Sequence, residues 1–241
     1  MMWPFKKKYT LADSGIFQEF TDWHSHILPG VDDGVRTMDE TLEILAVYEK
    51  LGVKTVWLTP HIMEDVPNTT VHLKERFEEL RAVYKGAISL HLAAEYMLDN
   101  LFRKRLDNND LLPLGEKESL LLVETSYYNP PANLFGLLEQ VKAKGFHPVL
   151  AHPERYMYLD DGDCMKLKQT GILFQANLPS LTGIYGREAK MKVERLLKNG
   201  YYNLIGTDTH RADSLTRITR IRSLSIGIIR KCSTCIENTE V

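Results

Sequence analysis

The sequence has few cysteines and no long apolar run. Its three cysteines, Cys164, Cys232 and Cys235, are too few for a disulfide scaffold, and the spacing of the last two lacks the second half of a zinc finger. We therefore expect a reducing compartment, the cytoplasm. No apolar stretch approaches the roughly 20 residues that cross a bilayer, and none follows the basic residues 6–8 as a signal-peptide core would. We expect no membrane insertion.

An excess of charge of one sign is also missing. The 241 residues include 30 Lys and Arg against 32 Asp and Glu, which gives a formal net charge of -2 at pH 7. This balance offers no bulk attraction to nucleic acid or to an anionic membrane, so we expect neither as a partner. With only 15 Gly, 10 Pro and 44% hydrophobic residues, the composition is that of a globular protein. Function must therefore come from a local site.

From residue 20 onward, short runs of apolar and β-branched residues alternate with longer segments of helical periodicity, which is typical of βαβ units with a parallel sheet. The seven predicted strands cover residues 20–24, 53–59, 88–94, 119–124, 147–151, 172–176 and 204–207. The predicted helices cover residues 37–51, 70–84, 134–144, 186–198 and 214–231. No repeat or linker divides the chain, so we expect an N-terminal extension over residues 1–19 and a single domain over residues 20–241.

Residue types that bind metals stand at the ends of nearly all of these strands. In chain order they are His24, His26, His61, Glu95, Glu124, His152, Asp208 and His210. The carboxyl ends of the strands of a (β/α) barrel converge on one face, whereas an open sheet would spread them along an edge at about 4.8 Å per strand. A single histidine or carboxylate at a strand end is as often a capped or solvated polar group as a metal ligand. Eight such residues, each at the end of a predicted strand, are poorly explained in that way. We therefore expect an α/β barrel with a metal site.

The ligand types narrow the chemistry. Imidazoles and carboxylates without thiolates suit Mn²⁺, Fe²⁺ or Zn²⁺, and the set exceeds what one ion can use, so we expect two or three ions. Such clusters activate a hydroxide and hold phosphoryl oxygens, which indicates hydrolysis of a phosphoester. Arg155 follows His152 by three residues and could hold a phosphate, although an ion pair with Glu154 or Asp160 is the alternative.

Four segments carry a resemblance to a known superfamily. They are residues 22–34 (Asp-Trp-His-Ser-His-Ile-Leu-Pro-Gly-Val-Asp-Asp-Gly), Thr59-Pro60-His61, His152-Pro153-Glu154-Arg155 and Thr207-Asp208-Thr209-His210. They resemble the PHP (polymerase and histidinol phosphatase) superfamily. Over about residues 20–215 the chain is similar to bacterial tyrosine-protein phosphatases of the CpsB/YwqE type, and residues 177–186 are similar to a stretch that separates this group from histidinol phosphatases.

The resemblance implies a distorted seven-stranded (β/α) barrel, PHP-like, with three metal ions, commonly Mn²⁺, at its C-terminal face. The residues implied to bind metal are His24, His26, Asp33, His61, Glu95, Glu124, His152, Asp208 and His210. Asp32 is the alternative to Asp33. The implied reaction is attack of a metal-activated hydroxide on phosphotyrosine. Asp208 or a nearby histidine would supply a proton.

The resemblance also implies two arginines that hold the phosphate, Arg155 and a second one. For the second arginine the sequence offers Arg211 or Arg217, since the last motif departs from the family pattern Ser-Asp-Ala-His-Asn. The implied partner is a tyrosine kinase of capsular or exopolysaccharide synthesis. The tyrosines at 127 and 128 are either a rim of the site or a packed turn. The remaining alternatives are a small-molecule phosphatase such as histidinol-phosphatase and a non-catalytic metal-binding regulator, and an oligomer is compatible with the sequence.

Overall fold

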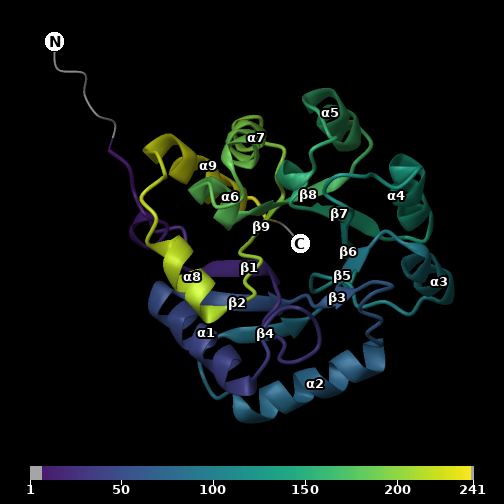
Figure 1. The fold of residues 1–241 in the computed structure, drawn as a ribbon, viewed down its shortest axis with the longest axis horizontal. Coiled ribbons are helices and arrows are strands. Elements are labelled where there is room, and N and C mark those ends of the chain that lie inside the picture. Colours follow the sequence, from purple (N-terminus) through teal and green to yellow (C-terminus); the bar gives the residue numbers. More distant parts are fainter. Residues whose placement is uncertain (1–6, 240–241) are drawn as a thin grey trace.

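Parallel strands curl into a half-barrel with helices on its outer side, in a computed structural model that describes residues 7–239 (Figure 1). In this part of the chain the strands form two parallel sheets, of order β1-β2-β4 and β3-β5-β6-β7-β8-β9. The strands are β1 (Phe20–Ser25), β2 (Val53–Leu58), β3 (His61–Ile62), β4 (Ser89–Leu92), β5 (Glu95–Met97), β6 (Leu120–Glu124), β7 (His147–Ala151), β8 (Leu173–Asn177) and β9 (Leu204–Gly206). The predicted α/β class with a parallel sheet is confirmed.

Each of the second and third predicted strands is followed by a short additional strand. Thr59 and Pro60 separate β2 from β3, and two alanines separate β4 from β5. A proline has no N–H group to donate to a neighbouring strand, which accounts for the first interruption. The chain still runs on beside its neighbour, because Ala93 N donates to Leu58 O at 2.9 Å and Glu95 N donates to Pro60 O at 3.1 Å. The predicted count of seven strands is therefore not confirmed.

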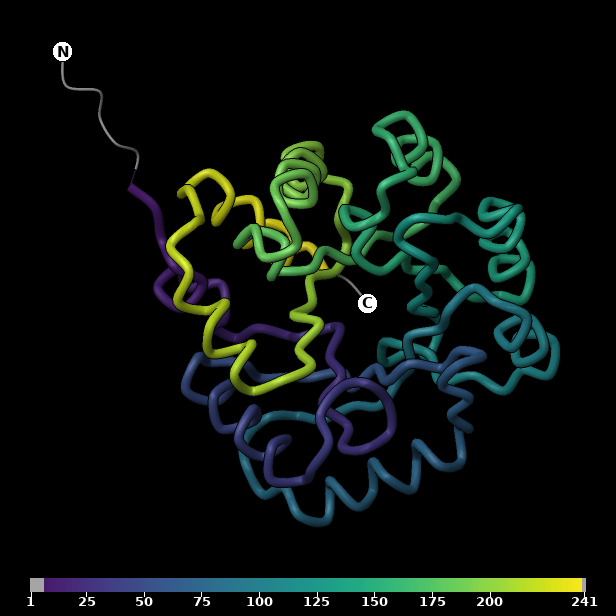
Figure 2. The backbone as a smooth tube through the Cα atoms, viewed as in Figure 1, coloured from purple at the N-terminus to yellow at the C-terminus, as the bar shows by residue number. Residues whose placement is uncertain are grey.

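The first and last strands meet at their carboxyl ends. Asp208 N donates to His24 O at 2.7 Å, and His26 N donates to Thr209 O at 3.0 Å. Figure 2 shows the purple β1 segment beside the segment that follows β9. Residues almost two hundred positions apart are thereby brought to one end of the fold.

The helices cover the outside of the two sheets (Figure 1). They are α1 (Met38–Leu51), α2 (Thr70–Val83), α3 (Asn100–Asn108), α4 (Leu134–Ala143), α5 (Asp161–Gln169), α6 (Leu178–Thr182), α7 (Arg187–Lys198), α8 (Ala212–Thr219) and α9 (Ile226–Glu237). The Thr37 side chain accepts a hydrogen bond from Glu40 N at the start of α1, and Gly52 ends this helix at φ 98°. No helix of residues 7–239 is both long and apolar enough to cross a membrane.

The single helix predicted over residues 214–231 is wrong, because the chain forms α8 and α9 with a break between them. Ser225 begins the second helix by accepting a hydrogen bond from Ile228 N. The N-terminal segment pairs with the chain at this break, since Tyr9 N donates to Leu224 O at 2.9 Å. Residues 1–6 of the predicted extension lie outside the described residues. In the rest of it, Leu11 and Phe17 are buried in the core.

Apolar side chains fill the inside of the curled sheet below the carboxyl ends of the strands. The cluster includes Trp57, Leu122, Val149 and Leu204, which come from four different strands. A second and larger cluster lies between the strands and the outer helices. The polar side chains at the open end of the half-barrel therefore lie above a packed apolar interior.

Gly206 at the end of β9 allows the close approach of β1. A Cβ atom at this position would meet the Cβ of His24 and would lie 2.9 Å from both His24 N and Gln175 Nε2. We predict that Gly206→Ala lowers the free energy of unfolding by about 1–3 kcal/mol, because the backbone of β1 must shift. Urea denaturation monitored by circular dichroism measures this change.

Gly227 in α9 provides the matched control. A Cβ atom there has its nearest neighbour, Ser225 Oγ, at 4.0 Å. Gly227→Ala is expected to leave stability unchanged or to raise it by about 0.5–1 kcal/mol, since alanine is the better helix former. Equal stability of the two variants would contradict the proposed role of Gly206.

Candidate metal centre

The structure brings all nine predicted metal-binding residues together at the carboxyl ends of the strands. Their ligand atoms form four groups, within each of which the atoms lie within 4.8 Å of one another. The groups are His26, Asp33, His61 and His210; His24, Glu95 and His152; His24, His26 and Asp208; and His61, Glu95 and Glu124. Four of the residues, His24, His26, His61 and Glu95, belong to two groups each. The groups therefore form one continuous cluster.

The Glu95 carboxylate lies at the centre of this cluster. Its Oε2 atom is 3.2 Å from Nε2 of His24, from Nε2 of His26 and from Nδ1 of His61. Its Oε1 atom is 3.0 Å from Nε2 of His152. Glu95 begins β5, so the interruption before this strand places the carboxylate at the open end of the half-barrel. One buried carboxylate thus contacts four imidazoles.

The Asp208 carboxylate connects the cluster to polar groups at its edge. Its Oδ1 atom lies 3.4 Å from Nε2 of His26 and 3.5 Å from Nδ1 of His210. Its Oδ2 atom accepts hydrogen bonds from Arg155 at 2.9 Å and from Asn177 Nδ2 at 2.7 Å. Asp208 therefore faces the imidazoles with one oxygen and orients the arginine with the other.

Asp32 and Asp33, the alternatives left open by the sequence, occupy different places. The Asp32 side chain is buried, and its Oδ2 atom accepts from Nδ1 of His26 at 2.8 Å and from the backbone N–H of His61 at 3.0 Å. The Asp33 side chain is 71% exposed, and its Oδ1 atom lies 3.6 Å from Nε2 of His61 and 3.5 Å from Nε2 of His210. Asp33 lies in a group of atoms that could hold a metal ion, whereas Asp32 orients a histidine from behind.

Opposite charges inside the cluster shift the pKa values of its members. Burial lowers the pKa of His24, but the Glu95 and Asp208 carboxylates outweigh burial and raise this pKa to about 9. For the pKa of His61, burial is again outweighed, here by Glu124 and Glu95, and the pKa rises to about 10. The buried carboxylates therefore require positive charge beside them, which protons on imidazole or bound cations provide.

The donor atoms fit divalent cations. Glu95 Oε2 and His61 Nδ1 are buried and lack a hydrogen bond of normal geometry to any described residue. The Nε2 atoms of His24 and His26 converge to 3.0 Å, although two unprotonated ring nitrogens would repel each other there. Imidazole nitrogens and carboxylate oxygens that point at a common centre are the ligands of Mn²⁺, Fe²⁺ and Zn²⁺.

Two of the predicted ligand residues have a left-handed backbone. His152 follows β7 with φ 35°, and Asp208 follows β9 with φ 52°. This region costs a residue with a Cβ atom roughly 1–2 kcal/mol. His152 is held there in part by its N–H group, which donates to Gln175 O at 2.9 Å.

Sequence reasoning missed Gln175 and Asn177 on β8. Gln175 Oε1 is 2.9 Å from Nδ1 of His24, and Asn177 holds Asp208. Both are fully buried. Their signal in the sequence is the alternate spacing, which puts two amides on the same face of a strand that ends in no metal-binding residue type. These amides fix the orientation of the ligands.

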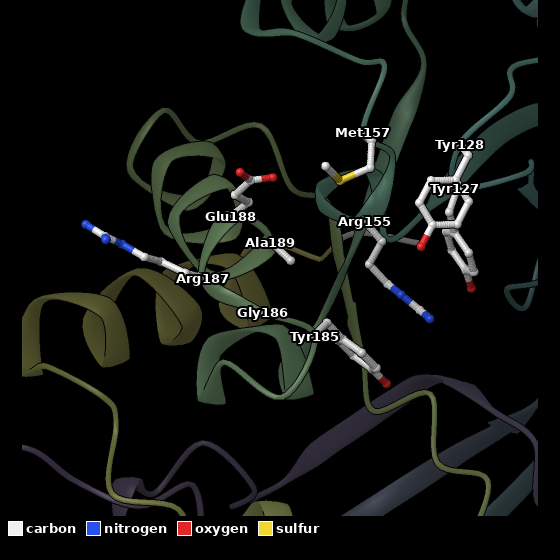
Figure 3. A pocket seen from close by; sticks show the side chains of 9 residues that line it. All are labelled: Tyr127, Tyr128, Arg155, Met157, Tyr185, Gly186, Arg187, Glu188 and Ala189. Carbon is white, nitrogen blue, oxygen red and sulfur yellow. The ribbon is translucent and has the colours of Figure 1, made fainter.

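A cavity of about 380 Å³ opens beside the cluster, and Arg155 lines it together with Tyr127 and Tyr185. The Arg155 guanidinium lies 4.3 Å from the ring centre of Tyr127 and 4.2 Å from that of Tyr185. Figure 3 shows Arg155 between the two rings. Arg155 pairs with Asp208, so neither Glu154 nor Asp160 is the partner that the alternative interpretation named. Its position at the cavity wall suits a phosphate-binding arginine.

Arg211 has a different environment. Its guanidinium donates to the carbonyl oxygens of Gly34 and His210, the latter at 2.7 Å. Neither Arg211 nor Arg217 is among the described residues that line the cavity. Arg211 therefore supports the loop that carries Asp33, and its role in phosphate binding stays a prediction.

Known proteins resemble this chain in sequence. Residues 20–237 match the family described as capsular polysaccharide synthesis, CpsB/CapC. The tyrosine-protein phosphatase YwqE of Bacillus subtilis (strain 168) is 28% identical over 195 residues, which are 78% of this chain and 76% of that protein. The tyrosine-protein phosphatase CpsB of Streptococcus pneumoniae is 27% identical over 206 residues, which are 80% of this chain and 84% of that protein.

Solved structures show the same fold. One, described as YwqE from Bacillus subtilis and CpsB from Streptococcus pneumoniae, metal-dependent tyrosine phosphatases, matches with a TM-score of 0.75 at 23% identity over 90% of this chain and 86% of the other. Histidinol phosphate phosphatase from Lactococcus lactis, complexed with zinc, L-histidinol and phosphate, matches with a TM-score of 0.52 at 14% identity over 92% and 94%. The sequence match over residues 20–237 covers most of the chain, and this protein therefore belongs to the CpsB/CapC family of capsular polysaccharide synthesis.

Proposed function

We propose that this protein is a metal-dependent tyrosine-protein phosphatase that acts in capsular or exopolysaccharide synthesis. The observation that carries the proposal is the cluster of nine histidine and carboxylate ligands with Arg155 at its edge. Relatives named as tyrosine-protein phosphatases support it. An intact ligand set argues against a non-catalytic regulator.

The four ligand groups would hold two or three divalent cations, and we propose Mn²⁺, with iron or zinc as alternatives. Bound cations of this kind neutralise charge on phosphoryl oxygens and make water a nucleophile near neutral pH. Gln175, Asp32 and Asn177 supply the hydrogen bonds that keep the ligands in place.

Arg155 would bind the phosphoryl oxygens of the substrate. The rings of Tyr127 and Tyr185 flank its guanidinium at the cavity wall, so little side-chain freedom is lost on binding. Asp208 keeps the guanidinium turned toward the cluster through the 2.9 Å hydrogen bond to Oδ2. A tyrosine leaving group, with a reference pKa near 10, needs less help from a proton donor than an alkoxide does.

The finer features of the fold and the biological setting are also proposals. β2 with β3, and β4 with β5, would each act as one strand of a distorted seven-stranded barrel, which the hydrogen bonds between Leu58, Pro60 and the next strand support. The protein substrate would be a bacterial tyrosine kinase of polysaccharide synthesis in the cytoplasm. The domain boundary at residue 20 is also a proposal. The start of the family match supports it, although Leu11 and Phe17 of the extension pack into the core of the domain.

His152→Ala is predicted to lower kcat/KM for a phosphotyrosine peptide by more than about 100-fold, because it removes a ligand from the cluster. Asp208→Ala is expected to have the same effect, and chelation by EDTA should abolish activity until Mn²⁺ is restored. Phosphate release measures activity, and elemental analysis measures bound metal.

His147→Ala is the matched control, since His147 is exposed at the start of β7. It should keep full activity. Full activity of metal-free protein would refute the metal-dependent reaction. Hydrolysis of histidinol phosphate without hydrolysis of the peptide would indicate the small-molecule phosphatase instead.

Arg155→Lys is predicted to lower kcat/KM by about 10–100-fold while metal content stays the same. A lysine keeps the charge but cannot stack as a plane between two rings or donate two parallel hydrogen bonds to a phosphate. Steady-state kinetics with the phosphotyrosine peptide measure the loss. Arg195→Lys on α7 is the control, because Arg195 pairs with Asp161 on the surface, and a loss of equal size there would contradict the role of Arg155.

Asp32→Ala is predicted to weaken metal binding by about 10–100-fold, because His26 loses the carboxylate that orients its ring. Titration of the metal-free protein with Mn²⁺ by calorimetry measures the affinities. Asp33→Ala should instead reduce the number of ions bound, since Asp33 lies among the ligand atoms. Unchanged affinity and stoichiometry in both variants would contradict these assignments.

A further inference from the structure

We propose that a groove on the far side of Arg155 binds the residue next to phosphotyrosine in the substrate chain, and that it selects a large apolar or aromatic side chain. This inference rests on the proposed phosphatase function. It concerns a part of the substrate that lies outside the metal cluster.

The groove has a volume of about 570 Å³. Its walls come from three separate segments, namely the loop after β6, the loop after Arg155 and the start of α7 (Figure 3). They include Tyr127, Tyr128, Arg155, Met157, Tyr185 and Ala189. None of the nine predicted metal ligands lines it. The groove could therefore bind part of a substrate, but it holds none of the residues predicted to carry out hydrolysis through bound metal.

Exposed apolar side chains are concentrated in this groove. Tyr128 is 75% exposed, Met157 62% and Tyr185 38%, and they are three of the nine large hydrophobic side chains that the described residues leave exposed. Exposed apolar surface that gathers in one hollow marks a site of interaction. An apolar side chain of a partner would remove this surface from water.

The groove is continuous with the metal cavity. Tyr127, Arg155 and Tyr185 line both, so the Arg155 guanidinium and the two rings beside it form a wall that the groove and the cavity share. Consecutive Cα atoms of a peptide are 3.8 Å apart. When the phosphate of a phosphotyrosine sits against Arg155 in the cavity, the residue beside it in the chain is carried to the rim that this wall forms. The occupant is thus a segment of the same peptide.

Interactions within the protein hold the groove open in advance. Lys192 on α7 donates from Nζ to Tyr156 O at 2.9 Å and to Leu159 O at 2.6 Å, which ties the helix to the opposite wall. Met157 N donates to Tyr127 O at 3.0 Å and joins the two loops. A preformed apolar site loses little free energy to ordering when the ligand binds.

Three charged residues line the groove, Arg155, Arg187 and Glu188, and Arg155 is already paired with Asp208. Figure 3 shows the Arg187 side chain directed away from the tyrosines, while Met157 and Ala189 face the hollow. Glu188 is the remaining charged group on that wall, and it would disfavour an acidic neighbour in the substrate.

The test uses the Mn²⁺-loaded protein and phosphotyrosine peptides that differ only in the residue before or after the phosphotyrosine. Peptides with phenylalanine or leucine at one of these two positions are expected to have a kcat/KM about 10-fold higher than peptides with glycine. Peptides with glutamate there should be poorer still. Equal kcat/KM for all of these peptides at both positions would overturn the proposal.

Met157→Glu is the variant that tests the groove, and Met165→Glu on α5 is its control, since Met165 is 45% exposed and is not among the lining residues. Met157→Glu should remove the preference for phenylalanine while kcat/KM for p-nitrophenyl phosphate changes by less than about twofold. Met165→Glu should keep the preference. Equal loss in both variants, or an unaltered preference in Met157→Glu, would overturn the inference. If the wild-type protein hydrolyses neither peptide nor p-nitrophenyl phosphate, the proposed phosphatase function itself fails.

Discussion

The contact of one buried carboxylate, that of Glu95, with four imidazoles is the interaction on which the rest of the site depends. A carboxylate taken out of water is costly unless positive charge and hydrogen bonds surround it. The four imidazoles around Glu95 serve this requirement. The imidazoles face the carboxylate with one nitrogen, and Gln175 and Asp32 hold the far nitrogens of His24 and His26. The orientation of these two rings is thus fixed from behind.

The fold provides such a site because its strands are parallel and the sheet curls. The predicted ligands come from the ends of different strands, and the hydrogen bonds between the ends of β1 and β9 bring the first and last of them into contact. Apolar side chains close the interior below. Water and substrate therefore approach from the open end, where Arg155 and its two tyrosines separate the metal cavity from the apolar groove. Arg155 thus lies between the proposed site of hydrolysis and the proposed site of substrate recognition.

The positions of the strands and the ligand types at their ends followed from hydrophobic patterning, because strand periodicity is local in the sequence. Asp33 lies on a loop, so only the family resemblance pointed to it. The partners of the ligands were not predictable: Gln175 contacts His24 across 151 positions, and Asn177 contacts Asp208 across 31. The break between α8 and α9 was also missed, since it depends on the pairing of Leu224 with Tyr9 far away in the chain. Local patterns reveal which residues carry chemistry, and tertiary contacts decide what holds them.

His152 and Asp208 have a left-handed backbone, a conformation that is unfavourable for folding at residues with a Cβ atom. Glycine adopts this conformation without steric penalty, so on conformational grounds it would be the better residue at both positions. His152 and Asp208 occupy these positions instead, and the rest of the fold must compensate for the conformational free energy that they cost. If these residues hold metal as proposed, the chain gives up some stability at two points to place their side chains, as enzymes do where the reacting geometry matters more than the ease of folding.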